Sequence, residues 1–206
     1  MTCGVTGASG FIGTHFLREL AARSVAAVAI GREDFSDPVR LREKTERCDA
    51  IVHFAGLSRH DDGEYLYRVN LELGKNLLQS VAGIPGKKPK LFLASTTHIT
   101  RDTPYHRSKR DLARLFESSG KDSAIFLMPN TFGPGGKVFY NSVVSTFCFL
   151  SAAGKTPDRI DDVMLDLIYV GTLVKKLADL TGEELAQVCG GLAPGRRYWP
   201  RYMGGS

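Results

Sequence analysis

A tyrosine and a lysine four residues apart have the spacing that proton-transfer chemistry requires. Tyr105 and Lys109 would lie about one turn apart on the same face of a helix. A tyrosine with its ordinary pKa of about 10 exchanges protons poorly at neutral pH. A neighbouring ammonium stabilises the phenolate and lowers that pKa. We therefore expect Tyr105 to be the catalytic acid or base, with Lys109 lowering its pKa.

Three hydroxyl side chains lie just upstream of this pair. Ser95, Thr96 and Thr97 follow the apolar segment 91–94, which is typical of a buried strand. A hydroxyl directed at a carbonyl oxygen would stabilise the negative charge that develops during reduction. Alternate strand residues face the same way, so Ser95 and Thr97 would point away from Thr96. Thr96 is the candidate for this role, with Ser95 and Thr97 as its adjacent alternatives, and the set predicts redox chemistry at a carbonyl.

A glycine turn near the N-terminus predicts a dinucleotide site. The sequence TGASGFIG at 6–13 follows an apolar strand and leads into residues with helical apolar spacing. Gly7 permits a tight turn, Gly10 lets a pyrophosphate approach the backbone, and Gly13 allows close packing of helix on strand. The free amides at the helix start would face the phosphates. The alternative is a purely structural glycine turn.

The elements that must position these residues alternate along the first 130 residues. We expect strands at 3–5, 25–30, 49–56, 91–94 and 124–128, all buried, and helices between them. Such alternation is typical of an α/β, doubly wound parallel sheet of the Rossmann type. His53, alone among apolar residues, is expected to be a core residue.

The end of the second strand bears on the choice of cofactor. Arg32 comes directly after this strand, where a dinucleotide-binding fold meets the adenosine ribose. An acidic side chain there would bind a 2′-hydroxyl, whereas an arginine would pair with a 2′-phosphate. Arg32 therefore favours NADP(H) over NAD(H), the alternative being an ordinary surface arginine.

Beyond residue 130 the pattern changes. We expect an irregular loop at 129–136, helices at 140–153 and 170–180, and short strands at 165–168 and 184–189. The predicted organisation is a dinucleotide-binding core at 1–130, a small and shortened substrate-binding lobe at 131–190 and a flexible tail at 191–206.

Composition narrows the classes of function. The net charge of the 206 residues is +5, and the basic residues are scattered without interleaved aromatics, so nucleic acid is not an expected partner. No apolar run is long enough for membrane insertion. The four cysteines lie far apart, which favours buried free thiols in the cytoplasm and no metal site.

Together these motifs resemble the extended short-chain dehydrogenase/reductases, a family of nucleotide-sugar epimerases, dehydratases and 4-keto reductases. HFAG at 53–56 and Asn70 are similar to further motifs of that family. The resemblance implies that Thr96, Tyr105 and Lys109 are the catalytic set. The cofactor contacts it implies are Thr6, Gly7, Ser9, Gly10, Phe11, Ile12, Gly13, Arg32, Phe54, Ala55, Gly56, Asn70, Ser95 and Pro129.

Within that family the chain resembles the reductase domain of CapF-type capsular polysaccharide biosynthesis proteins. The resemblance rests on the short gap from Thr96 to Tyr105 and on the segment 140–148. It implies an NADPH-dependent reductase of a 4-keto, UDP-linked deoxysugar, with Asn130 and Asn141 holding the nucleotide-sugar substrate. We expect no cupin domain of the CapF type, and Met128 and Gly171-Thr172 depart from the family pattern, so we expect sugar recognition to differ from that of the family.

Two other functions are compatible with the same motifs. One is a nucleotide-sugar epimerase or dehydratase with tightly bound NAD(P), although Thr97 and His98 stand where dehydratases carry Asp-Glu. The other is a redox-inactive NADP(H)-binding sensor or scaffold. Relatives often form a homodimer through the helix that begins near Tyr105 and the helix before it, so a homodimer is a possible assembly.

Overall fold

The computed structural model describes residues 1–119, 122–181 and 197–198 of the chain. Its centre is a parallel sheet with the strand order β2-β1-β3-β4-β5-β8. The strands are β1 (Thr2–Thr6), β2 (Ala26–Ile30), β3 (Ala50–His53), β4 (Lys90–Thr96), β5 (Ser123–Met128) and β8 (Arg197–Tyr198). The expected doubly wound, Rossmann-like fold is confirmed.

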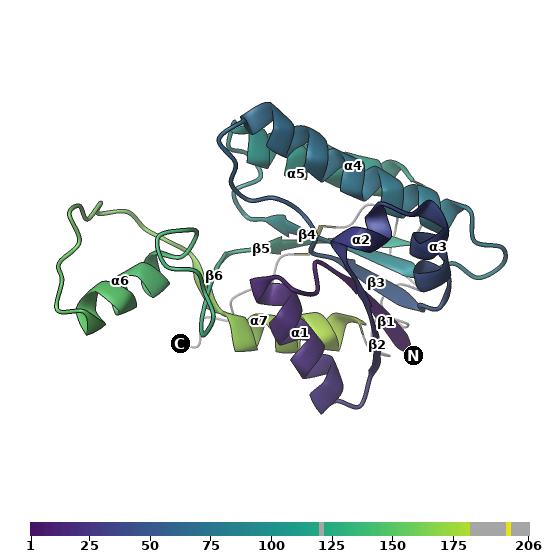
Figure 1. Cartoon of the computed structure of the whole chain (residues 1–206), viewed down its shortest axis with the longest axis horizontal. Helices are drawn as coiled ribbons and strands as arrows, with labels where there is room; N and C mark the ends of the chain where they lie inside the picture. The colour runs from purple at the N-terminus through teal and green to yellow at the C-terminus, as the bar shows by residue number, and fades with distance from the viewer. Residues whose placement is uncertain (120–121, 182–196, 199–206) are drawn as a thin grey trace.

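Helices cover both faces of this sheet (Figure 1). On one face lie α1 (Phe11–Ala22) and α7 (Val170–Thr181), and on the other α3 (Pro38–Glu46), α4 (Gly63–Ala82) and α5 (Pro104–Ser118). Each face has its own apolar cluster, centred on Phe16 and Phe92 under α1 and on Leu112 and Phe116 under α5. The sheet is therefore the rigid middle layer whose edge carries the site.

Strand β2 differs from the expectation of a buried strand. Ala26, Ala27 and Ala29 are exposed, and only Ile30 is fully buried. Within the described chain β2 pairs with β1 alone, so it is an edge strand. The small apolar residues of this segment predicted a strand correctly, but they do not distinguish an edge strand from a central one.

A short helix, α2 (Arg32–Phe35), follows β2 and was not expected. Helix α3 begins at Pro38, and its cap is Asp37, whose Oδ1 accepts hydrogen bonds from the amides of Val39 and Arg40 at 3.0 and 3.2 Å. An Asp before a Pro at the first helical position is a strong start signal for a helix.

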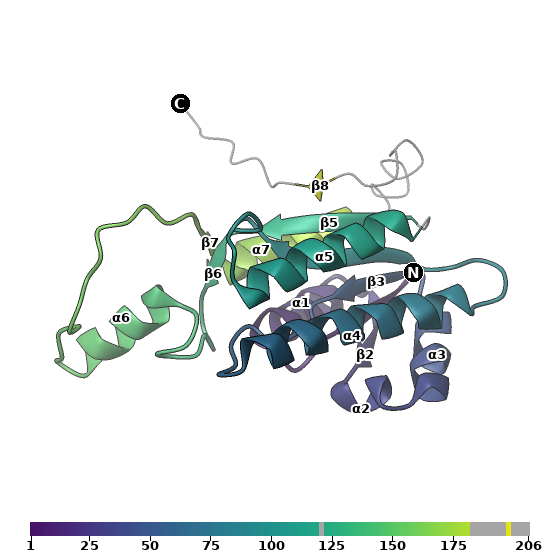
Figure 2. The same cartoon turned by 90° about the horizontal axis from the view of Figure 1, so that it is seen from above.

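The region after residue 129 holds a second small sheet. β6 (Asn130–Phe132) pairs in parallel with β7 (Leu167–Tyr169), where part of an irregular loop was expected. Helix α6 (Val143–Ala152) extends away from the core and contains no buried residue (Figures 1 and 2). Helix α7 packs on α1 inside the main core rather than with the expected lobe.

The strand expected at 184–189 and most of the tail expected at 191–206 lie outside the described residues.

Within the described residues, no helix is both long and apolar enough to cross a membrane.

Candidate active site

The site lies where the order of the strands reverses. β1 pairs with β2 on one side and with β3 on the other, so the loops after β1 and β3 emerge beside one another. Ligands of open parallel sheets bind at such a switch point, at the carboxyl ends of the strands. Buried Thr6 joins the two loops, because its Oγ1 lies 2.9 Å from His53 Nδ1 and accepts a hydrogen bond from the Ala55 amide at 3.1 Å.

The glycine turn after β1 has the geometry that its spacing predicts. Gly7 has a φ of +66°, and a Cβ there would lie 2.8 Å from the Ala55 amide nitrogen. A Cβ on Gly13 would collide with the carbonyl oxygen of Gly7. Gly10 caps α1 without any side-chain hydrogen bond, and the first turn of α1 contains no acidic residue. The cradle and the uncapped helix start fit a pyrophosphate.

Replacing two of these glycines with alanine should separate folding from cofactor binding. Gly13→Ala is expected to destabilise the protein by about 1–3 kcal/mol, because the added methyl group meets the backbone. Gly10→Ala should lower the melting temperature less than Gly13→Ala does, since the φ of Gly10 is −76° and the one close neighbour of the added Cβ, Gly7 O at 3.1 Å, need move only slightly. It should nevertheless weaken NADPH binding. Calorimetry with and without NADPH tests both, and equal stability of the two variants would contradict the assignment.

The expected cofactor contacts divide into an accessible set and a supporting set. Around the turn and the end of β3, Ser9, Gly10 and Gly56 are exposed, and Phe11, Ile12, Phe54 and Ala55 are half-buried. Thr6, Asn70, Ser95 and Pro129 are buried. Of these buried residues, Thr6 and Asn70 hydrogen-bond the loop after β3.

Asn70 shows how this support works. Its Oδ1 accepts a hydrogen bond from the Leu57 amide at 2.7 Å, and its Nδ2 donates to Leu57 O at 2.9 Å and to Ser108 Oγ at 3.0 Å. Both amide protons are therefore used within the protein. Asn70 therefore fixes the loop after β3 against α5.

Arg32 lies exposed at the start of α2, next to the end of β2. The nearby carboxylate of Asp34 turns inward, where it is fully buried and pairs with Arg40 and Lys44 at 2.7 Å each. Burial acts to raise the pKa of Asp34, but these partners and the Gly31 amide hold it below its usual value. The carboxylate of Asp34 is thus paired with two basic side chains of the same chain. Exposed Glu33 lies against Gly31.

The start of α5 brings the tyrosine and the lysine together. Thr103 caps the helix and Pro104 begins it, so Tyr105 falls in the first turn. Lys109 is 6% exposed, and its Nζ donates a hydrogen bond to Ala94 O on β4 at 3.0 Å. Burial lowers the pKa of Lys109 to about 8.

The electrostatics of Tyr105 differ from the expectation of a lowered pKa. Burial raises the pKa of Tyr105 to about 12. The ammonium of Lys109 is bonded to Ala94 O and lies 5.8 Å from the centroid of the Tyr105 ring. In this arrangement desolvation outweighs the charge of the lysine, so Tyr105 keeps its proton at neutral pH.

Thr96 ends β4 with a half-buried hydroxyl. Its Oγ1 accepts a hydrogen bond from the His98 amide at 3.1 Å, which leaves the hydroxyl proton free to donate. The Oγ atoms of Ser95 and Thr97 are buried and have no hydrogen-bond partner among the described residues. The three hydroxyls therefore differ in their surroundings, as the strand alternation predicts.

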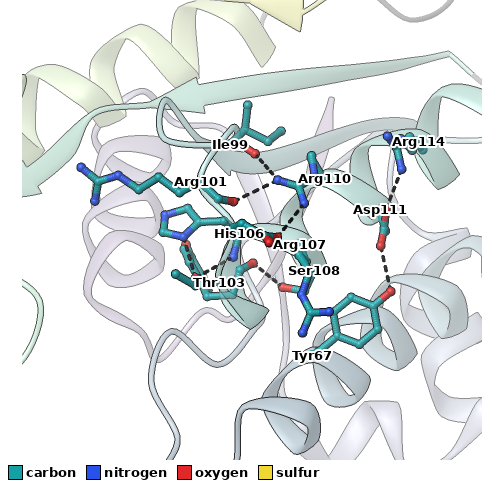
Figure 3. A network of polar contacts seen from close by, with 12 residues as sticks. Tyr67, Ile99, Arg101, Thr103, His106, Arg107, Ser108, Arg110, Asp111 and Arg114 are labelled. Atoms are coloured by element: carbon teal, nitrogen blue, oxygen red, sulfur yellow. Dashed lines mark hydrogen bonds and ion pairs between the residues drawn. The ribbon is translucent and has the colours of Figure 1, made fainter.

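The short loop between Thr96 and α5 is held by an arginine that the sequence analysis missed (Figure 3). The guanidinium of Arg110 donates to Ile99 O at 3.1 Å and to Arg101 O at 2.9 Å. It also approaches Asp102 at 3.5 Å. One side chain thus fixes the loop that joins the hydroxyl to the tyrosine.

The two expected substrate residues, Asn130 and Asn141, each contact a side chain that the sequence pattern did not predict as a partner. Asn130 Nδ2 lies 3.2 Å from His98 Nε2. Asn141 is exposed, and its Nδ2 donates to Ser58 Oγ at 2.6 Å, which ties the segment before α6 to the loop after β3. Both asparagines therefore lie on segments that reach the carboxyl edge of the sheet.

The cysteines and other potential ligands do not form a metal site among the described residues. Burial raises the pKa of the Cys3 thiol to about 12 and that of Cys48 to about 11. Cys148 is exposed, contrary to the expectation of buried thiols, and Cys189 lies outside the described residues.

Comparison with known proteins identifies the family. The model of the NAD dependent epimerase/dehydratase family matches residues 3–175. The chain belongs to this family. A UDP-2-acetamido-2,6-beta-L-arabino-hexul-4-ose reductase from Pseudomonas aeruginosa is 32% identical over 178 residues, which cover 83% of this chain and 47% of that protein. The predicted resemblance to extended short-chain dehydrogenase/reductases is confirmed.

Solved structures of the epimerase/dehydratase family show the same fold. The capsular polysaccharide assembling protein CapF from Staphylococcus aureus has a TM-score of 0.70 and 26% identity, over 95% of this chain and 51% of that chain. UDP-glucose 4-epimerase from Thermus thermophilus, in complex with NAD, has a TM-score of 0.71 and 23% identity, over 88% and 74%. The chain thus spans about half the length of its curated reductase relative and of CapF.

Proposed function

We propose that the protein is a cytoplasmic, NADPH-dependent reductase of a 4-keto nucleotide-linked deoxysugar. The observation that carries the proposal is the grouping of Thr96, Tyr105 and Lys109 at the edge of the sheet that also carries the glycine cradle. The relative from Pseudomonas aeruginosa, whose name specifies reduction of a 4-keto UDP-sugar, supports the choice of substrate class.

The residues have distinct roles in this reaction. NADPH, when bound at the glycine turn, supplies the hydride for C4 of the sugar. Tyr105 donates its proton to the carbonyl oxygen, and the Thr96 hydroxyl donates a hydrogen bond to the same oxygen. The charge of Lys109 stabilises the phenolate that remains. The raised pKa of Tyr105 suits a proton donor, because the phenol is fully protonated at neutral pH.

The direct test is the oxidation of NADPH in the presence of UDP-2-acetamido-2,6-beta-L-arabino-hexul-4-ose. We propose that the 4-hydroxy sugar and NADP⁺ form in equal amounts. An epimerase, the second candidate, would consume no NADPH and would retain its cofactor through purification. A sensor or scaffold would bind NADPH without turnover across a panel of keto-sugars.

Arg32 should decide the preference between the two nicotinamide cofactors. Arg32→Ala is expected to lower the ratio of kcat/KM for NADPH over NADH by about 10–100-fold, because a charged hydrogen bond to the 2′-phosphate is lost. Arg18→Ala, an exposed arginine on α1, is the matched control and should leave the ratio unchanged. An unaltered ratio in Arg32→Ala would show that this arginine is an ordinary surface residue.

We further propose that two copies associate through α4 and α5. The outer face of these helices carries polar pairs within the chain, namely Tyr67 with Asp111 at 2.8 Å (Figure 3) and Arg107 with Glu64 at 2.6 Å. A homodimer through this face would therefore bury a largely polar surface rather than an apolar seam.

A further inference from the structure

His98 lies between the reacting hydroxyl and the amide of Asn130. Its backbone nitrogen donates to Thr96 Oγ1 at 3.1 Å, and its ring Nε2 lies 3.2 Å from Asn130 Nδ2. An amide NH₂ group can only donate a hydrogen bond, so Nε2 must be the accepting nitrogen. The imidazole is therefore neutral and carries its proton on Nδ1.

This contact sets the orientation of the Asn130 amide. The Nδ2 atom is directed to His98, and the Oδ1 atom accepts no hydrogen bond from any residue that the structure describes. The backbone of Asn130 is fixed separately, because its amide donates to Asp166 O at 3.1 Å. The side chain thus offers its unoccupied Oδ1 as an acceptor, beside the second proton of Nδ2, which the contact with His98 leaves unused.

We propose that His98 is a positioning residue that keeps the oxygen of the Asn130 amide toward the substrate, and that protonation of His98 reverses this amide. The inference rests on the proposed function and assigns a regulation to the same site. An oxygen in this place accepts a hydrogen bond from a sugar hydroxyl or from an acetamido N–H. A protonated imidazole has two donors, so Nε2–H would face the NH₂ group until the amide turns.

The surroundings of His98 place this change in the acidic range. The groups that face it are Arg101 on its own loop, His106 on α5, with ring centroids 6.5 Å apart, and Asp166 before β7. Burial and Arg101 lower the pKa of His98 from its ordinary 6.5, and Asp166 acts in the opposite direction. At neutral pH the neutral imidazole of His98 therefore keeps the Asn130 amide in this orientation. The hydrogen bond is lost as the pH falls through the pKa of His98.

The kinetic test compares wild type with His98→Gln, whose amide oxygen can accept the same hydrogen bond but does not titrate. In wild type, KM for the keto-sugar should rise about fivefold to tenfold as the pH falls below 6.5, the loss expected for one hydrogen bond. His98→Gln should keep the neutral-pH KM and show no such rise. His106→Gln, the neighbouring histidine, should retain the acid rise. An equal rise in His98→Gln would overturn the proposal.

A second measurement works without turnover. The chain has five histidines, so ring ¹⁵N NMR spectra can resolve the tautomer of each. At neutral pH, His98 should carry its proton on Nδ1, and in Asn130→Leu this tautomer preference should be lost. If no keto-sugar is reduced but the tautomer responds to Asn130→Leu, the proposed function fails while the His98–Asn130 contact stands. An Nε2–H tautomer in wild type would refute the contact itself.

Discussion

Tyr105→Phe is expected to lower kcat by about 10²–10⁴-fold, because the variant has no phenolic proton to donate to the carbonyl oxygen. KM and the melting temperature should change little, since the described structure shows no hydrogen bond from the Tyr105 hydroxyl that would be lost. Stopped-flow measurement of NADPH oxidation under single-turnover conditions isolates the chemical step.

The matched control for this variant is Tyr67→Phe. The Tyr67 hydroxyl donates to Asp111 Oδ2 at 2.8 Å on the outer face of α4, away from the glycine turn (Figure 3). We expect Tyr67→Phe to retain the native rate. Turnover by Tyr105→Phe at the native rate would remove Tyr105 from the mechanism and leave only its place in the fold.

Lys109→Met should reduce activity and increase stability at the same time. Burial lowers the pKa of Lys109 from 10.5 to about 8, which means that the fold opposes the charge that the reaction uses. At pH 7 this opposition costs up to about 3 kcal/mol of unfolding free energy. The methionine is similar in length and carries no charge, so urea unfolding at pH 7 should show a higher midpoint while kcat falls by at least about tenfold.

The pH dependence of this effect has a definite sign. Between pH 8 and 10.5 the unfolded chain binds more protons at Lys109 than the folded chain does, so wild-type stability rises relative to Lys109→Met across that window. The difference in unfolding free energy should therefore vanish above about pH 10.5. In wild type, kcat should also fall above about pH 8, where the ammonium is lost.

Exposed Lys75→Met on α4 provides the comparison, because it removes a positive charge without a burial cost. It should change neither the unfolding midpoint nor kcat appreciably. A Lys109→Met variant that is less stable than wild type at pH 7 would show that the hydrogen bond to Ala94 O outweighs the desolvation of the ammonium.

The burial of Tyr105 and Lys109 does not stabilise the fold, so the site depends on packing elsewhere in α5 for its stability. Half-buried Tyr105 and buried Lys109 lie one turn apart. Desolvation raises the pKa of the tyrosine and lowers that of the lysine, so it favours the neutral form of each. The fold tolerates them because α5 is anchored elsewhere, by Leu112 and Phe116 in the core and by Arg110 on the loop before it. The cost of the site is thus offset by packing at some distance from it.

The sequence by itself determined the fold class, the glycine turn and the order of most helices and strands. These properties depend on local spacing: Gly7 needs a positive φ, Gly13 needs close contact, and Asp37 before Pro38 begins a helix whatever lies around it. The same locality placed Tyr105 and Lys109 on one helical face. Patterns of this kind are readable because each involves residues only a few positions apart.

Only the tertiary structure decided how deeply each predicted residue is buried and which distant groups surround it. Thr6, Asn70 and Ser95 match the expected motifs, yet all three are buried, and Thr6 and Asn70 hydrogen-bond the loop after β3. The pKa of Tyr105 is set by desolvation, which depends on packing from several elements at once. His98 meets Asn130 across a separation of 32 positions, and Arg110 reaches the loop between Thr96 and Tyr105. Such contacts follow from the path of the whole chain, because no local pattern fixes which distant groups will meet.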